Sequence, residues 1–146
     1  MAKLGMLDGG GAAANGTIDA NVTTAAATAL TRRMAAQATV LLRNRPVGSH
    51  PVLPLSNNIS VAVIGAAADG AGAIYGGGGS GAVVPKYAVS VLQALRWRLG
   101  DAVSYCNGSA AEAAEAAAAA DVALVVLADT SSEGYDRSNL TLPPVR

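Results

Sequence analysis

The feature that most constrains the fold is an alternation of short apolar runs with stretches of helical spacing. The apolar runs are Ile59–Gly65, Ala102–Cys106 and Asp121–Ala128, and we expect each to form a strand. The last is the most apolar and predicts a buried strand. Because helices between successive strands are typical of parallel sheets with right-handed connections, this order predicts an α/β fold with a mostly parallel sheet.

Two segments between these strands have apolar residues at helical spacing. The first is Tyr87–Leu99, and Gly100 after it is suited to end a helix. The second is the Ala/Glu-rich segment Ser109–Ala120, with Ser109 as the N-cap and Glu112 at the capping-box position. These two helices would connect the three strands.

The N-terminal part of the chain contains one more predicted helix, over Thr23–Leu42. A Gly/Ala-rich linker to about Ala20 precedes it, and a Pro-rich connector, Arg43–Asn58, follows it. The apolar residues along one face of this helix are Leu30, Met34, Ala38 and Leu41.

The composition limits the core and the class of partner. Apolar residues make up 51% of the 146 residues, but aromatics are only 3% and phenylalanine is absent. A core of alanine and valine buries little area per residue, so we expect modest stability. The formal net charge is zero and the basic residues are scattered, apart from Arg32-Arg33 and Arg96/Arg98. This pattern argues against a nucleic-acid surface, which needs clustered cations.

Several other functional classes find no support in the sequence. No apolar run reaches the ~18–20 residues of a membrane span, and the N-terminus has no signal-peptide pattern. Cys106 is the single cysteine, and we expect it to be a part-buried thiol rather than a metal ligand. His50 is the single histidine. The sequence has no G-x-S-x-G motif of a nucleophilic serine to accompany it, so we predict that His50 is a loop residue. We expect neither a metal nor a cofactor.

An acidic loop follows the last predicted strand, with the sequence S-E-G-Y-D-R over residues 132–137. A carboxylate there lies where open α/β sheets present ligand-contacting groups. Tyr135, Asp136 and Arg137 surround Glu133 with a ring, an acid and a cation, which can shift a carboxyl pKa in either direction. The residues alone leave two interpretations open: a general acid/base loop, and a solvated loop with a surface ion pair.

A glycine-rich loop, Asp69–Gly81, follows the first strand of the predicted sheet. It lacks the G-x-G-x-x-G order of a dinucleotide-binding loop, and residues 76–81 lack the Lys-Ser/Thr that ends a phosphate loop. A nucleotide site is therefore disfavoured. A flexible linker and a tight loop with an exposed backbone both remain open.

Several motifs together resemble a known family. The string S-E-G-Y-D-R-x-N-L-x-L-P, from Ser132 to Pro143, resembles the acid/base loop of family 3 glycoside hydrolases, the β-glucosidase family. Met1–Asp8 is similar to the family's K-x-x-L-G-L-F-D segment, where its catalytic barrel ends, and Leu30–Asn44 resembles its linker helix. The segments similar to the opening of the family's second domain are Leu53–Leu55, Val61–Gly65, Gly76–Gly81 and Val84–Pro85.

The resemblance implies an incomplete three-layer α/β/α sandwich. Residues 1–55 would be a linker from a missing barrel domain, with one helix, and residues 56–146 a partial α/β sandwich domain. Because Met1 lies inside a family segment, we expect this chain to be a fragment of a longer protein. We also expect the isolated chain to lack glycosidase activity.

The implied activity is that of a retaining β-glycosidase, β-glucosidase-like, acting on a β-linked glucoside or oligosaccharide. Glu133 would be the general acid/base, and the nucleophile would come from the N-terminal barrel domain, with none in this chain. Such an acid must keep its proton until the glycosidic bond breaks, so its surroundings should raise its pKa.

The supporting roles also follow from the resemblance. Asp136 and Arg137 would form an ion pair that fixes the loop, with Tyr135 packed beside it. The loop at the mouth of the substrate site would comprise Gly76, Gly77, Gly78, Gly79, Ser80 and Gly81.

A different class of function remains open, namely a non-catalytic α/β carbohydrate-binding or interaction module. It would keep the scaffold and the glycine-rich loop without acid chemistry. A nonfunctional remnant is a third interpretation.

Five N-x-S/T sequons suggest a glycoprotein of the secretory pathway, although Asn, Ser and Thr also gather in turns. The sequon asparagines are Asn15, Asn21, Asn58, Asn107 and Asn139.

Overall fold

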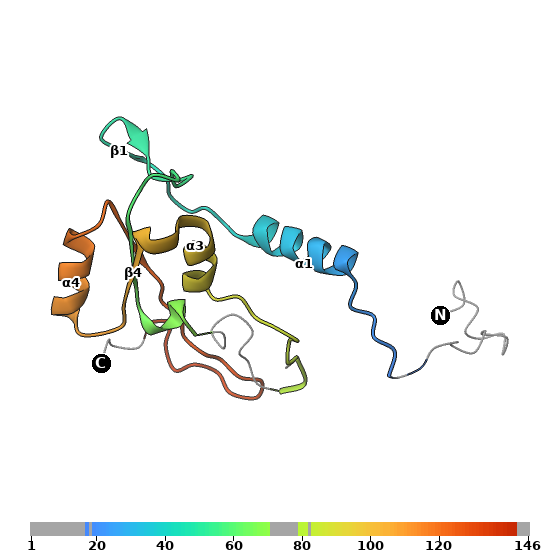
Figure 1. The fold of residues 1–146 in the computed structure, drawn as a ribbon. Helices are drawn as coiled ribbons and strands as arrows, with labels where there is room; N and C mark the ends of the chain where they lie inside the picture. The colour runs from blue at the N-terminus through green and yellow to red at the C-terminus, as the bar shows by residue number, and fades with distance from the viewer. Residues whose placement is uncertain (1–16, 18, 71–78, 82, 143–146) are drawn as a thin grey trace. The chain divides into compact units, whose positions relative to one another are not determined.

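The structure of the chain is a computed structural model that describes residues 17, 19–70, 79–81 and 83–142 (Figure 1). It divides the chain into two compact units, Met1–Pro46 and Val47–Arg146. The predicted boundary at residue 55, between a linker and a domain, stays a prediction.

The first unit contains helix α1 (Ala25–Ala38). The helix begins after Thr24 because the Thr24 hydroxyl accepts a hydrogen bond from the backbone N–H of Ala27 at 3.0 Å, a typical N-cap contact. The helix predicted over residues 23–42 is therefore present but shorter. Its expected apolar face stays open to solvent, since Leu30 and Met34 are 46% and 58% exposed.

The Pro-rich connector contains two very short paired strands, β1 (Pro46–Val47) and β2 (His50–Pro51). Gly48 lies between them with a φ of 69°, a conformation that favours glycine. His50, predicted as a loop residue, is thus the first residue of β2, because the turn at Gly48 brings the two short segments together.

The second unit is built on a three-stranded parallel sheet. Its strands are β3 (Val61–Ile64), β4 (Val103–Cys106) and β5 (Val122–Val125), in the order β4-β3-β5. The predicted α/β fold with a parallel sheet is confirmed. The strands lie inside the three predicted runs but are shorter. Both β4 and β5 pair only with the four residues of β3, so the sheet ends where β3 ends.

Two helices connect these strands, and Figure 1 shows them on either side of the sheet. Helix α3 (Val91–Leu99) joins β3 to β4, and α4 (Ala110–Ala118) joins β4 to β5. Both begin at a serine that caps the first turn. The N-cap of α3 is Ser90, whose hydroxyl accepts a hydrogen bond from the Gln93 N–H at 3.1 Å. The helix therefore begins at Val91 and not at Tyr87 as predicted.

The ends of these helices match the sequence closely. In α4, the Ser109 N–H and hydroxyl both donate to the Glu112 carboxylate, at 2.7 and 2.8 Å, so the predicted capping box is confirmed. The end of α3 is also as predicted, at Gly100 with a φ of 60°.

The core lies between the sheet and α3 and is small. Val61 and Val63 alternate along β3 and therefore point to the same face, where Leu92 packs on them. Ala68 and Val103 complete the buried cluster. This core consists mainly of valine and alanine, as the composition indicated.

Strand β5 is less buried than predicted. Its residues alternate between half-buried and exposed, and Val125 is 56% exposed. The apolar run Asp121–Ala128 led us to expect a buried strand, and this expectation is wrong for the described part of the chain. Within that part β5 pairs only with β3, so one face and one edge stay open.

A polar clamp ties the start of β5 to the start of β3. The Asp121 carboxylate accepts hydrogen bonds from the Ser60 N–H and hydroxyl, both at 2.8 Å. The Asp121 N–H donates back to the Ser60 hydroxyl oxygen at 2.9 Å. These donors, the backbone N–H first, lower the pKa of Asp121 because they stabilise the ionised form.

The small core predicts a large effect of truncating its central leucine. Leu92 is 1% exposed, and Leu92→Ala should lower the free energy of unfolding by about 2–5 kcal/mol through lost burial and a cavity. Urea denaturation measures this change. Leu140→Ala is the matched control, because Leu140 is 93% exposed and its loss should change stability by less than about 0.5 kcal/mol. Equal unfolding midpoints for the two variants would contradict this assignment of the core.

The Ser60–Asp121 clamp predicts acid sensitivity. Because the folded-state pKa of Asp121 lies below its ordinary value of 3.8, its stabilisation is complete above that value and is lost as the pH falls through the folded-state pKa. Asp121→Asn should weaken stability at neutral pH and flatten its decline below about pH 5. Asp101→Asn, at an exposed aspartate, should leave that decline unchanged. Parallel declines for wild type and Asp121→Asn would disprove the linkage.

Candidate active-site loop

The strand order places a candidate site between the ends of β3 and β5. The chain passes from β3 to its neighbour β4 and then returns across β3 to β5, so the strand order reverses between β3 and β5. Open α/β sheets bind ligands in the crevice at such a reversal, beyond the carboxyl ends of the strands. The loops that follow β3 and β5 contain the glycine-rich segment and Glu133.

Glu133 lies at the tip of a tight turn. The N–H of Tyr135 donates to the carbonyl of Ser132 at 3.4 Å, and the two residues form an isolated antiparallel bridge. Gly134 has a φ of 84°, whereas no other residue type among those described has a positive φ. A positive φ at the third position alone is typical of a type II turn, which requires glycine there. The turn presents the Glu133 side chain at an exposed position.

The glycine-rich loop meets Glu133. The Ser80 N–H donates to Oε2 of Glu133 at 2.7 Å, and the Ser80 hydroxyl donates to the same oxygen at 3.0 Å. Figure 1 shows the segment after β5 reaching the short 3₁₀ turn Gly79–Gly81. Two segments more than fifty residues apart in the sequence are thus joined by one carboxylate.

This contact requires a residue without a side chain next to Ser80. Gly79 has a φ of 81°, and a Cβ placed on it would overlap the Glu133 carboxylate. Both the backbone conformation and the close approach therefore favour glycine. The sequence analysis left open a flexible linker and a tight loop, and for residues 79–81 the structure has a tight turn. Gly76, Gly77 and Gly78 lie outside the described residues.

The Ser80 contacts set the electrostatics of Glu133. The backbone N–H first, and the hydroxyl second, lower the pKa of Glu133 below its ordinary value of 4.5 because they stabilise the carboxylate. This direction is opposite to the raised pKa expected from the resemblance. The reason is that Glu133 is exposed and faces two donors, so burial does little to favour the protonated form.

The ion pair that holds the loop differs from the predicted one. Arg137 pairs with Asp129 at 2.5 Å, and the same guanidinium donates to the carbonyl of Thr141 at 2.8 Å. The predicted Asp136–Arg137 pair is therefore wrong. Asp129 comes directly after the apolar run, so Arg137 links the beginning of the loop to its later part.

The remaining predicted loop residue is also placed differently. Tyr135 is 83% exposed, so its ring does not pack beside an ion pair as expected. Its contribution to the loop is the backbone bridge to Ser132. The Asp136 side chain is exposed as well.

Other features of the described residues bear on function. No group of three or more metal-ligating side chains lies together in this part of the chain. Among the described helices, none is long and apolar enough to cross a membrane. Cys106 is half-buried and free, as predicted.

Four of the sequon asparagines are exposed, while Asn15 lies outside the described residues. Asn139 is held by Thr141, whose N–H donates to its side-chain oxygen at 3.0 Å. Glycosylation at these sites stays a prediction.

The fold and this edge of the sheet define an α/β domain with ligand-contacting loops at the carboxyl ends of its strands. The model of the Glycosyl hydrolase family 3 C-terminal domain matches residues 39–146, which is most of the chain. The chain therefore belongs to this family, and the resemblance stated from its motifs is confirmed. No curated protein and no solved structure gives a significant match.

Two contacts at the site were missed by sequence reasoning. Ser80 was placed in the mouth loop but not recognised as the partner of Glu133, and Asp129 was not considered. The strand order could have suggested the first contact, since it predicts that the loops after β3 and β5 meet. For the second, Arg137 pairs with Asp129, eight residues earlier, and this depends on the path of the loop.

Removing the Ser80 hydroxyl should raise the pKa of Glu133. In Ser80→Ala one donor is lost, while the backbone N–H, the larger contributor, remains, so the pKa should move toward its ordinary value without reaching it. NMR titration of the Glu133 carboxyl carbon measures this shift. Ser138→Ala is a control in the same loop and should leave the titration unchanged. An unaltered or lower midpoint in Ser80→Ala would show that the hydroxyl does not contact the carboxylate in solution.

Proposed function

We propose that this chain supplies the general acid/base of a retaining β-glycosidase, and that Glu133 is this residue. The observation that carries the proposal is the Ser80–Glu133 contact, which holds a carboxylate beyond the carboxyl ends of β3 and β5. Membership in the Glycosyl hydrolase family 3 C-terminal domain family supports glycoside hydrolysis as the chemistry.

The mechanism needs a second carboxyl group, which we assign to a barrel domain in the parent protein. In a retaining reaction one carboxylate attacks the anomeric carbon, and the other group, about 5–5.5 Å away, protonates the leaving oxygen. The acid/base group then removes a proton from the water that hydrolyses the glycosyl-enzyme. Glu133 would perform both proton transfers.

The lowered pKa of Glu133 is compatible with this role once the second carboxylate is considered. A like charge a few ångströms away favours the protonated form and raises the pKa. Docking of the nucleophile-bearing domain would oppose the effect of Ser80 on Glu133. After the nucleophile has become part of a neutral glycosyl ester, the Ser80 donors would favour the carboxylate, which is the form needed as a base.

The rest of the loop would position Glu133 without taking part in proton transfer. Arg137 is occupied by Asp129 and by the Thr141 carbonyl, so it braces the loop rather than facing the substrate. The segment 76–81 would border the mouth of the site. The substrate would be a β-linked glucoside or oligosaccharide.

Replacing Glu133 tests the proposal in the parent protein, in which the barrel and this chain are joined. Glu133→Gln should lower kcat for an aryl β-glucoside by about 10²–10⁴-fold, because an amide cannot transfer the proton. Azide should restore part of the turnover with an activated aryl glycoside, because such a leaving group needs no acid and azide replaces the base-activated water.

The matched control is Glu115→Gln, which makes the same chemical change at an exposed position on α4. Its kcat should equal that of the wild type. Full turnover in Glu133→Gln would reject the acid/base role and favour a non-catalytic binding module. Turnover by residues 1–146 alone, if lost in Glu133→Gln, would reject the assignment of the nucleophile to another domain.

A further inference from the structure

An apolar cavity of about 730 Å³ lies at the carboxyl ends of the three strands, and its volume is within the range of small-molecule sites. Ile64 of β3 pairs with Cys106 on one side and with Val125 on the other, so the three residues form a row across the sheet. Because Val61 and Val63 point toward α3, the alternation along β3 directs Ile64 and its row to the opposite face. All three residues of the row line the cavity.

The wall opposite this row is helix α4, which contacts all three strands. Its residues Ala110, Ala113 and Ala114 line the cavity, and their spacing of three and four places them on one helical face. An alanine side chain ends at Cβ, so this face of α4 cannot fill the space above the row. The cavity therefore follows from small side chains on the helix.

The lining of the apolar cavity selects against ions. Among the described residues, none that lines it carries a charge. The half-buried thiol of Cys106 behaves as a small apolar group. The exposed amide of Asn107 is the one polar side chain of the described lining besides this thiol. An ion would lose its hydration here without gaining a counter-charge, whereas an uncharged apolar molecule would gain burial.

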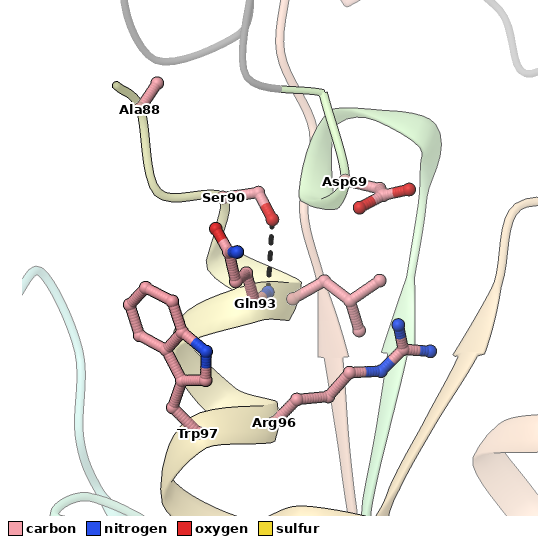
Figure 2. A pocket seen from close by; sticks show the side chains of 7 residues that line it. Asp69, Ala88, Ser90, Gln93, Arg96 and Trp97 are labelled. Carbon is pink, nitrogen blue, oxygen red and sulfur yellow. Dashed lines mark hydrogen bonds between the residues drawn. The ribbon is translucent and has the colours of Figure 1, made fainter. Parts of the chain in front are cut away.

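Another cavity, beside α3, lacks this uniform lining. Its volume is about 350 Å³, and the charged side chains of Asp69 and Arg96 line it. Figure 2 shows the ring of Trp97 and the side chain of Arg96 extending to different sides of α3. The side chains at α3 therefore do not converge on one ligand, whereas the row of the sheet and the alanine face of α4 enclose a common space.

The apolar cavity also lies between the two ends of the Glu133 loop. Leu127 and Ala128 precede the loop, Leu142 ends it, and all three line the cavity. Neither Glu133 nor Ser80 does, so the cavity is distinct from the Ser80–Glu133 contact. Leu127 and Leu142 are 56% and 49% exposed, which leaves apolar surface for an occupant. A molecule in the cavity would contact both ends of the loop at once.

We propose that this cavity binds an uncharged apolar molecule of about twenty non-hydrogen atoms, and that the bound molecule joins the two ends of the Glu133 loop. Its body packs between the row Cys106–Ile64–Val125 and the alanine face of α4. One hydrogen-bonding group on the molecule contacts the Asn107 amide. The inference rests on the cavity and not on the acid/base role of Glu133.

An uncharged fluorescent probe with one N–H group, N-phenyl-1-naphthylamine, tests the proposal with residues 1–146. Its emission should rise in a saturable way, with one site per chain and a Kd on the order of 10 μM. The anion 8-anilinonaphthalene-1-sulfonate adds a sulfonate to the same skeleton. It should bind at least about tenfold more weakly, because no described residue of the lining is cationic. Equal affinities, or an emission that does not saturate, would overturn the proposal.

A pair of variants on α4 locates the bound probe. Ala113→Phe should fill the cavity and weaken binding by more than about tenfold. The control Ala111→Phe makes the same change at an exposed position of α4 that does not line the cavity, and it should bind as tightly as the wild type. Circular dichroism should show both variants folded.

The single cysteine gives a second measurement that needs no variant. Because Cys106 lines the cavity, the naphthylamine should slow its alkylation by N-ethylmaleimide. Unchanged alkylation at a saturating concentration of the probe would place the probe elsewhere and overturn the proposal. Wild-type affinity in Ala113→Phe would do the same.

Hydrogen exchange followed by mass spectrometry tests the effect on the loop. Opening of the loop ends would remove Leu127 and Leu142 from the occupied cavity. The probe at ten times its Kd should therefore slow exchange in residues 127–142 by about tenfold. Helix α1 belongs to the other unit and should keep its exchange rate. Equal exchange of the loop with and without the probe would contradict the joining of its ends.

Discussion

The pairing of β3 with a parallel strand on each side is the constraint on which the rest of the structure depends. Val61 and Val63 form the centre of the core, and the same strand carries the backbone ladder to both β4 and β5. Because β3 is central, the loops after β3 and β5 leave the sheet side by side. Ser80 can reach Glu133 for this reason, although neither residue contributes to the core. The Ser60–Asp121 clamp fixes the same two strands at their N-terminal ends, away from the Ser80–Glu133 contact.

The electrostatics of Glu133 are compatible with the proposed site, whose two catalytic groups would come from different parts of a protein. A general acid needs surroundings that favour its protonated form, but the described residues place two donors on its carboxylate and thus favour the ionised form. The missing influence would be a second carboxylate, which can only act when its domain is in place. The proposed arrangement would limit proton transfer to the assembled site. It also gives a physical reason for expecting no turnover from this chain by itself.

Much of the fold could be predicted from the sequence because the local rules and the tertiary contacts agree there. The capping box at Ser109 and the helix stop at Gly100 depend on residues within one turn, so the sequence contains all that determines them. The burial of β5 could not be predicted from the sequence in this way. It depends on which other elements cover the strand, and the apolar character of the strand does not determine that. The partner of Arg137 was missed for a related reason: the pairing with Asp129 follows from the path of the loop.

Polar contacts fix the Glu133 loop within the described part of the chain, and this affects what the loop can do. Every residue from 127 to 142 is exposed, and the loop is fixed by the Asp129–Arg137 pair, the Ser80–Glu133 contacts and its own turn. Segments with few buried apolar groups open at a lower free energy than core strands do. A carboxylate on such a loop can adjust to a surface that closes over it. In the proposed site the sheet edge would be the rigid part, and the loop would reach its final geometry against the domain that carries the nucleophile.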